Sequence, residues 1–303
     1  MSPSSGAGGP ASSAHIPVML HEVLALLAVQ PGQIIVDGTV GGGGHSREII
    51  KLLGSTGRLI AIDRDTMMLN LAKSHIESPQ CTFRQSSYAQ LPQILSDLEI
   101  PLVQGILVDL GFSSDQLEDH SRGFRFDSHG PLDLRFDVTF GEPAWQYLQH
   151  VEESVLADVL WTYGEERFSR EIAAEIVRHR PTGVKLTAEL VVELVLKAIP
   201  RRFQQDARRH SATRVFQALR IAVNRELEQL EKSLNESFPS VLAPGGRLVV
   251  ISFHSLEDRL VKTAFRNREQ WQCLTPKPLT ASPVEMRMNP RSRSAKLRGA
   301  VRL

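Results

Sequence analysis

The sequence predicts an α/β fold in which an open, mostly parallel sheet is interrupted by an all-helical insert. Short apolar runs alternate with helical stretches over the first 112 residues, which is the pattern of right-handed βαβ units. Residues 113–212 then hold several helical stretches and no strand-like run. A long helix and another apolar run follow them and resume the alternation.

Apolar spacing and turn residues place each element along the chain. A helical spacing covers 19–28 and ends at Pro31-Gly32. Short apolar runs predict strands, and the segments between them predict helices: strands at 34–36, 59–62, 82–85 and 105–108, helices at 46–53 and 66–76. The insert is expected to contain helices at 151–163, 167–179 and 188–199. One apolar stripe predicts a single helix over 213–234, and a turn at 244–246 leads into a strand at 247–252.

These elements divide the 303 residues into four parts. Residues 1–14 are rich in Ser, Gly, Pro and Ala, so we expect a disordered tail, and they lack the features of a signal peptide. Residues 15–112 and 213–303 are expected to build the sheet domain, the second part ending in a basic segment. Residues 113–212 are expected to form the helical insert and to recognise the substrate.

Composition limits the function before any motif is considered. Thirty-five basic and 34 acidic residues leave a net charge of +1, which excludes a uniformly basic nucleic-acid binder. Two cysteines, Cys81 and Cys273, are too few for a disulfide framework or a cysteine metal site, so we expect no metal and place both in the core. There is no run of about 18 apolar residues, so we expect a cytoplasmic protein that contacts no membrane.

The clearest local signal is a glycine-rich loop at 36–45, between a strand and a helix start. Glycines let the backbone approach a ligand closely, and the helix N-terminus behind them favours an anionic group. Asp63 ends the next strand, where an acid can accept both ribose hydroxyls of an adenosine. The loop and this acid together predict a cofactor that contains adenosine.

The charge of Asp37 distinguishes between two classes of cofactor that contain adenosine. Asp37 lies at the entrance of the loop, where it would repel the pyrophosphate of a dinucleotide. S-adenosylmethionine carries an ammonium group that Asp37 could pair and a carboxylate that the helix N-terminus could hold. We therefore favour S-adenosylmethionine, with a dinucleotide-dependent oxidoreductase as the competing hypothesis.

Asp109 ends the fourth strand and should face the same crevice. We expect Asp109 and Gln116 to contact the ligand, and Asp109 is the candidate catalytic residue because an acid there can help an amine proton leave. Methylation of cytosine C5 needs a cysteine nucleophile and is disfavoured, whereas ribose O-methylation stays open. Tyr88 could either stack on an adenine or pack in the core.

Two basic clusters indicate a nucleic-acid partner. Residues 286–303 contain six Lys or Arg and no acid, and a second cluster covers 201–214. Arginines interleaved with Ser and Asn suit contacts to phosphate. The residues expected to bind RNA are Arg214, Arg291, Arg293, Lys296 and Arg298.

The motifs together resemble the RsmH (MraW) family of bacterial methyltransferases, which modify N4 of a cytosine in small-subunit ribosomal RNA. The matching stretches are residues 15–24, 37–46, 105–114, 122–124, 131–135, 163–166, 216–221, 251–259 and 289–298. Two positions depart from the family pattern: Ser211 stands where the family usually has Pro, and Phe136 replaces a Met.

The resemblance implies a class I, Rossmann-like methyltransferase fold with an inserted helical domain. It implies transfer of a methyl group from S-adenosylmethionine to a decoding-centre cytosine of 16S ribosomal RNA, in a small-subunit particle. The cofactor contacts that carry over are Gly43, Gly44, His45, Asp63, Tyr88, Asp109 and Gln116. The alternative is a non-catalytic, RNA-binding ribosome assembly factor that retains a cofactor pocket. The oligomeric state stays open, with a homodimer as one option.

Overall fold

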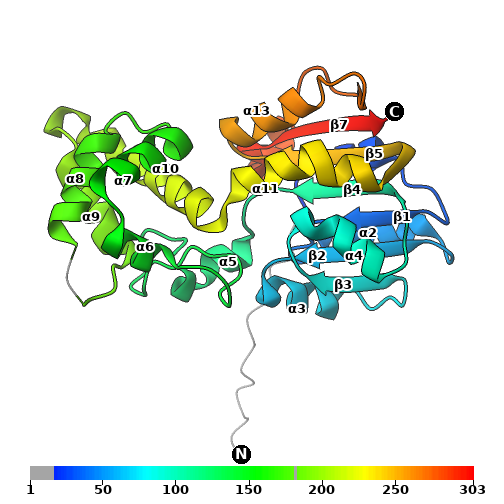
Figure 1. Cartoon of the computed structure of the whole chain (residues 1–303), viewed down its shortest axis with the longest axis horizontal. Coiled ribbons are helices and arrows are strands. Elements are labelled where there is room, and N and C mark those ends of the chain that lie inside the picture. The colour runs from blue at the N-terminus through cyan, green and yellow to red at the C-terminus, as the bar shows by residue number, and fades with distance from the viewer. Residues whose placement is uncertain (1–16, 181–182) are drawn as a thin grey trace, which may run out of the picture.

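The computed structural model describes residues 17–180 and 183–303, and the tail predicted at 1–14 lies outside them. Two bodies lie side by side along the long axis of the molecule (Figure 1). One is a sheet covered by helices on both faces, and the other is a group of helices drawn in green. The main division that the sequence predicts, a sheet domain and a helical insert, is visible in this arrangement.

The described chain forms one seven-stranded sheet of order β3-β2-β1-β4-β5-β7-β6. Its strands are β1 Ile34–Asp37, β2 Arg58–Asp63, β3 Cys81–Gln85, β4 Val103–Asp109, β5 Leu242–Ser252, β6 Trp271–Cys273 and β7 Lys296–Arg302. β1 to β5 pair in parallel, and β7 is antiparallel to both β5 and β6. The α/β fold class is confirmed. The two C-terminal strands were not predicted, because β7 is rich in Lys and Arg and β6 has only three residues.

Alternate residues of the strands point to opposite faces of the sheet, and each face is covered. Ile35 belongs to a cluster formed with α1 Leu20–Leu27 and α2 Gly44–Leu53, whereas its neighbour Val36 belongs to the opposite cluster. That second cluster is completed by α4 Leu91–Asp97, α11 Glu226–Lys232, α12 Phe238–Val241 and α13 Ser255–Ala264. α3 Thr66–His75 packs beside the first. In the part of the chain that the structure describes, no helix is long and apolar enough to cross a membrane.

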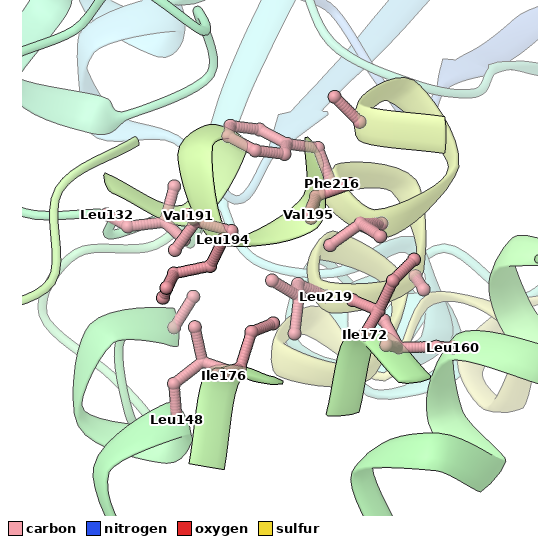
Figure 2. Close-up of a cluster of buried hydrophobic side chains, with 14 of the residues drawn as sticks. Leu132, Leu148, Leu160, Ile172, Ile176, Val191, Leu194, Val195, Phe216 and Leu219 are labelled. Carbon is pink, nitrogen blue, oxygen red and sulfur yellow. The ribbon is translucent and has the colours of Figure 1, made fainter. Parts of the chain in front are cut away.

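The insert has a hydrophobic core of its own (Figure 2). Its helices are α6 Ala144–His150, α7 Glu153–Gly164, α8 Ser169–His179, α9 Ala188–Ala198 and α10 Gln204–Asn224. Side chains from these helices point toward one another, among them Leu148, Leu160, Ile172 and Val195. This core is separate from the two clusters on the sheet, so the insert packs as a distinct unit.

The predicted end of the insert at residue 212 is wrong. Phe216 and Leu219 are buried in the core of the insert, so α10 belongs to the insert as far as Asn224. The sequence indicated one helix over 213–234, but Arg225 adopts a left-handed conformation with φ 52° and separates α10 from α11. The continuous apolar stripe did not reveal this break. Its residues on α10 pack into the core of the insert, whereas those on α11 pack against the sheet.

Candidate active site

A cavity opens at the carboxyl ends of β1, β2 and β4. The strand order reverses between β1 and β4, which is where open α/β sheets bind ligands. Its walls come from the glycine loop, from the strand ends, from α5 Ser114–Glu118, from the insert through Phe136, and from the C-terminal segment through Arg291. Segments from all parts of the sequence therefore meet at one point.

The glycine loop shapes the cavity floor because two of its residues have no room for a side chain. A Cβ on Gly38 would lie 3.1 Å from Cβ of Tyr88. Gly43 has φ 82°, and a Cβ there would lie 2.9 Å from Cδ1 of Ile76. Gly44, the first residue of α2, lines the cavity, so the free N-terminal amides of that helix are available to an anionic group. Gly43 was expected to contact the cofactor, but it lies outside the lining and serves the turn and its packing.

Asp37 was expected to contact the cofactor. Its side chain is buried beneath the loop and does not line the cavity. Its carboxylate accepts a hydrogen bond from Oγ of Ser46 at 2.7 Å and another from the amide of Thr39 at 3.2 Å. Burial raises the pKa of Asp37. Asp37 therefore holds the loop against α2.

Asp63 lies where the sequence placed it, at the end of β2 and on the cavity wall. Its two carboxylate oxygens accept hydrogen bonds from the amides of Gly41 and Asp65, each at 2.9 Å. Burial raises the pKa of Asp63 to about 6. A carboxylate oxygen can accept more than one hydrogen bond, so Asp63 both fixes the glycine loop and keeps capacity for ribose hydroxyls.

Tyr88 and Gln116 both line the cavity. The ring of Tyr88 is mostly buried and packs 6.0 Å from the ring of Phe238, so Tyr88 is a core residue as well as part of the wall. The side-chain amide of Gln116 is already engaged. Its Nε2 donates to Asp65 at 2.7 Å, and its Oε1 accepts from the amide of Ser113 at 2.8 Å.

Asp109 differs from the other acids of the cavity in its hydrogen bonding and in its pKa. Its Oδ1 is buried and has no hydrogen-bond partner among the described residues. Burial raises the pKa of Asp109 to about 7, even though the nearby charge of Arg291 acts to lower it. A buried carboxyl group with an unused oxygen and a pKa near neutrality can accept a hydrogen bond or a proton from a ligand.

His45 stands next to Asp109, with its Nδ1 3.8 Å from Oδ2 of the acid. Its Nε2 lies 2.9 Å from the carbonyl oxygen of Val18, so Nε2 carries the proton and donates it. Burial lowers the pKa of His45 and keeps the ring neutral. The histidine therefore closes the cavity wall and anchors the segment that precedes α1.

The structure adds residues that were not expected at this site. Arg291 donates to the carbonyl of Phe112 and, at 3.2 Å, to Oγ of Ser114. Glu257 is buried at the cavity wall. Burial acts to raise the pKa of Glu257, but the charges of His254 and Arg220 outweigh it, so the net pKa is lowered. Glu257 and Arg291 lie in the stretches 251–259 and 289–298, two of the motifs that match the family, so these motifs were the sequence signal that could have placed both residues at the site.

The cations that were expected to bind RNA occupy different environments. Arg298 is only 4% exposed and donates to Asp258 at 2.6 Å, so its assignment to RNA is wrong. Lys296 lies 3.4 Å from the same carboxylate.

The other cations lie elsewhere. Arg291 lines the cavity, whereas it was expected to contact RNA phosphate. Arg293 is exposed, and Arg214 is exposed beside Glu166 at 3.4 Å. The side chains of Arg208 and Arg209, in the second basic cluster, lie outside the described ones.

The two cysteines are not part of the site. Cys81 begins β3, and Cys273, which was expected in the core, is exposed on β6. Neither lines the cavity. Among the described residues, no group of three or more His, Cys, Asp or Glu side chains could hold a metal ion.

Comparison with known proteins gives a consistent result. The sequence profile of the MraW methylase family matches residues 12–303. The ribosomal RNA small subunit methyltransferase H of Koribacter versatilis is 45% identical over 309 residues, covering 98% of this chain and 96% of the relative. Proteins of the same name from Rhodopirellula baltica and Thermotoga neapolitana are each 45% identical, covering 100% and 94% of this chain and 96% and 95% of their own lengths. An rRNA methylase structure from Streptococcus thermophilus aligns with 94% of this chain and 95% of its own at 10% identity and a TM-score of 0.44.

Proposed function

The chain belongs to the MraW methylase family, and from that premise we propose that it methylates the exocyclic N4 amine of a cytosine in 16S ribosomal RNA. It is an S-adenosylmethionine-dependent ribosomal RNA methyltransferase, like the relatives that match it over nearly their whole length. The observation that carries the finer proposal is Asp109, with its unpartnered Oδ1 at the end of β4.

The donor set of the cavity fits S-adenosylmethionine. Asp63 would hold the ribose hydroxyls, and the N-terminus of α2 at Gly44 would hold the carboxylate. Tyr88 supplies an aromatic wall for the adenine. When bound, the cofactor supplies a methyl group activated by its sulfonium. With Asp37 buried beneath the loop, the choice of this cofactor depends on the other residues and on family membership.

The residues around Asp109 meet the chemical demand of an amine acceptor. The lone pair of the N4 amine is delocalised into the cytosine ring, so it becomes nucleophilic only when acceptors bind its N–H groups. The carboxylate of Asp109, whose side chain is 20% exposed, can accept one of them. Formation of the N4–methyl bond would break the bond between the methyl carbon and the sulfur of the cofactor, which would leave as the neutral thioether S-adenosylhomocysteine. The amine would lose one proton, and a carboxylate whose pKa is about 7 can take that proton and later release it to water.

The charges of Arg291 and Glu257 shift the pKa of Asp109 in opposite directions. The pKa of Asp109 is raised by burial, lowered by the positive charge of Arg291 and raised by the negative charge of Glu257. Arg291 therefore keeps part of Asp109 ionised near neutral pH. This arrangement favours catalysis over the alternative of a non-catalytic assembly factor.

We further assign the substrate to a small-subunit particle and the reaction to the cytoplasm. The support is the family and the charge distribution. Arg214 and Arg293 are exposed cations, and each is next in the sequence to a residue, Thr213 or Ser294, that lines a cavity between the sheet domain and the insert. A particle, in which RNA is held in a defined shape, would present one cytosine to a cavity of this kind.

The direct test is product analysis. The purified protein is incubated with isotopically labelled S-adenosylmethionine and with small subunits from cells that lack it, and the RNA is digested to nucleosides for mass spectrometry. We expect the label on N4-methylcytidine from one site. Label on 2′-O-methylcytidine, the acceptor left open by the sequence, or no label at all would contradict the proposal.

A further inference from the structure

A second cavity of about 330 Å³ lies between the sheet domain and the insert. It shares Gly111, Phe112 and Arg291 with the cofactor cavity, and these three residues form the wall between the two. Gly111 and Phe112 belong to the loop that follows Asp109, and Arg291 comes from the C-terminal segment. A ligand in the second cavity would therefore lie beside the loop that follows Asp109.

Phenylalanines dominate the lining of this second cavity. Five of them come from four separate segments: Phe112, Phe124, Phe126, Phe216 and Phe253. Such a lining suits a flat ring, because a nucleobase has two π faces that stack on aromatic side chains and polar edges that form hydrogen bonds. Polar side chains at the margin, including Gln217 and His254, can meet such an edge.

The five rings are not equally available. Phe112 is stacked on Phe124 at 5.3 Å between ring centroids, and the guanidinium of Arg220 lies 5.2 Å from the centre of its ring. Phe126 meets the ring of Phe216 edge to face at 4.9 Å. Phe253 is only partly buried and has no ring or cation contact with the other described residues.

The position of Phe253 is nevertheless fixed. It directly follows β5, and its amide donates to Oε2 of Glu257 at 2.8 Å. Glu257 is itself buried at the wall of the cofactor cavity. A rigid aromatic ring is thus held at the carboxyl end of the strand next to β4, beside the loop of Asp109.

We propose that the second cavity holds the target pyrimidine, turned out of its RNA strand and stacked on Phe253, with its amine directed across the shared wall to Asp109. The proposal rests on the proposed function, because it places the substrate of that reaction. An enzyme that acts on a base inside structured RNA must take the base out of its stack. The cavity supplies the aromatic surface that replaces the lost stacking.

The test measures recognition of the base separately from chemistry. Two rRNA hairpins are compared, one with the target cytosine and one with an abasic site in its place, in the presence of saturating S-adenosylhomocysteine. The wild-type protein should bind the cytosine hairpin about 5- to 150-fold more tightly, the range expected for one base stacked on an aromatic side chain. Phe253→Leu should lose most of this preference, and Phe253→Tyr should retain it.

Controls separate this role from a general effect on the fold. Trp161→Leu removes an exposed aromatic ring from the insert, outside both cavities, and should change nothing. Calorimetry should show wild-type affinity of Phe253→Leu for S-adenosylmethionine. If Phe253→Leu unfolds, Phe253→Met, which removes the ring but keeps a long apolar side chain, takes its place.

Equal binding of both hairpins by the wild type, or an undiminished preference in a folded Phe253→Leu, would overturn the proposal. Either result leaves the product analysis untouched, so the two ideas fail separately. Absence of N4-methylcytidine from the wild-type reaction would instead count against the proposed function.

Discussion

At the scale of single residues, burial gives the site its chemistry. Asp37, Asp63 and Asp109 end neighbouring strands, yet they differ in what surrounds their oxygens. Asp37 is satisfied by Ser46 and Thr39, and Asp63 is held by two amides. Asp109 alone of these three keeps an oxygen with no partner among the described residues. We therefore infer different roles for three similar acids: Asp37 braces the loop, Asp63 contacts the cofactor and Asp109 accepts from the substrate amine.

We expect Asp109→Asn to abolish most of the activity without loss of cofactor binding. The amide has the same shape but cannot take a proton, and the loss of a general base typically costs on the order of 10²- to 10⁴-fold in rate. The measurement is single-turnover methylation of small subunits together with calorimetry of S-adenosylmethionine binding. A variant that retains more than a tenth of the wild-type rate, a loss roughly tenfold smaller than the low end of that range, would remove Asp109 from the proton path.

The pH dependence gives a second prediction for the same carboxyl group. The active form is the carboxylate, so kcat/KM at limiting cofactor should fall as the pH drops through about 7. Arg291 lowers the pKa of Asp109, so Arg291→Met should raise that pKa and move the acid limb to higher pH. Arg293→Met, which changes an exposed neighbour, is the matched control and should leave the limb in place. An unmoved limb in Arg291→Met would contradict this account.

At the scale of elements, one buried ion pair joins the insert to the cofactor site. Nη1 of Arg122 lies 2.9 Å from Oδ2 of Asp65, the N-cap of α3. Nη2 of the same guanidinium donates to the carbonyls of Arg135 at 2.7 Å and Phe136 at 3.0 Å. Phe136 lines the cofactor cavity. Arg122 thus holds an aromatic residue of the insert at the wall of the cofactor cavity.

We expect Arg122→Met to weaken cofactor binding as well as the fold. Removal of one partner from a buried ion pair costs about 3–5 kcal/mol, because the other charge stays buried without compensation. Arg122→Lys keeps the charge but cannot reach two carbonyls and the acid together, so it should recover stability more than affinity. Urea unfolding and calorimetry measure the two quantities. Wild-type cofactor affinity in both folded variants would show that the insert does not shape the cavity.

The C-terminal segment contains both an exposed cation, Arg293, and a buried one, Arg298. Arg293→Ala should weaken RNA binding and reduce the slope of log affinity against log salt by about 0.7–0.9, the effect of one phosphate contact. Arg298 is the internal control, since its buried pair with Asp258 predicts that Arg298→Met lowers stability and leaves the salt slope unchanged. Identical slopes for Arg293→Ala and wild type would exclude Arg293 from the RNA interface.

At the scale of the whole molecule, two bodies are connected at a small, well-ordered junction. Asn224 ends α10 and is buried there. Its Nδ2 donates to the carbonyl of Leu134, its Oδ1 accepts from the amide of Phe136, and its carbonyl accepts from Nη1 of Arg64 in the sheet domain. The insert is therefore oriented over the cavity by specific hydrogen bonds, in addition to its two chain connections.

The sequence predicted the parts that depend on local pattern. Apolar runs, turn residues and terminal acids located five strands and the glycine loop. Local pattern could not show that Asp37 turns inward toward Ser46. Arg291 could not be placed at the cavity from spacing either, since it lies 179 residues from Phe112, which it contacts. Long-range contacts of this kind decided which predicted site residues were wrong.

The central claim is that this chain places a cytosine amine against Asp109. The most direct measurement is nucleoside mass spectrometry of 16S ribosomal RNA from cells that lack the protein and carry either the wild-type gene or Asp109→Asn. We predict that N4-methylcytidine is restored at one position by the wild type and stays absent with a stably expressed Asp109→Asn. Restoration by both genes, or by neither, would contradict the account.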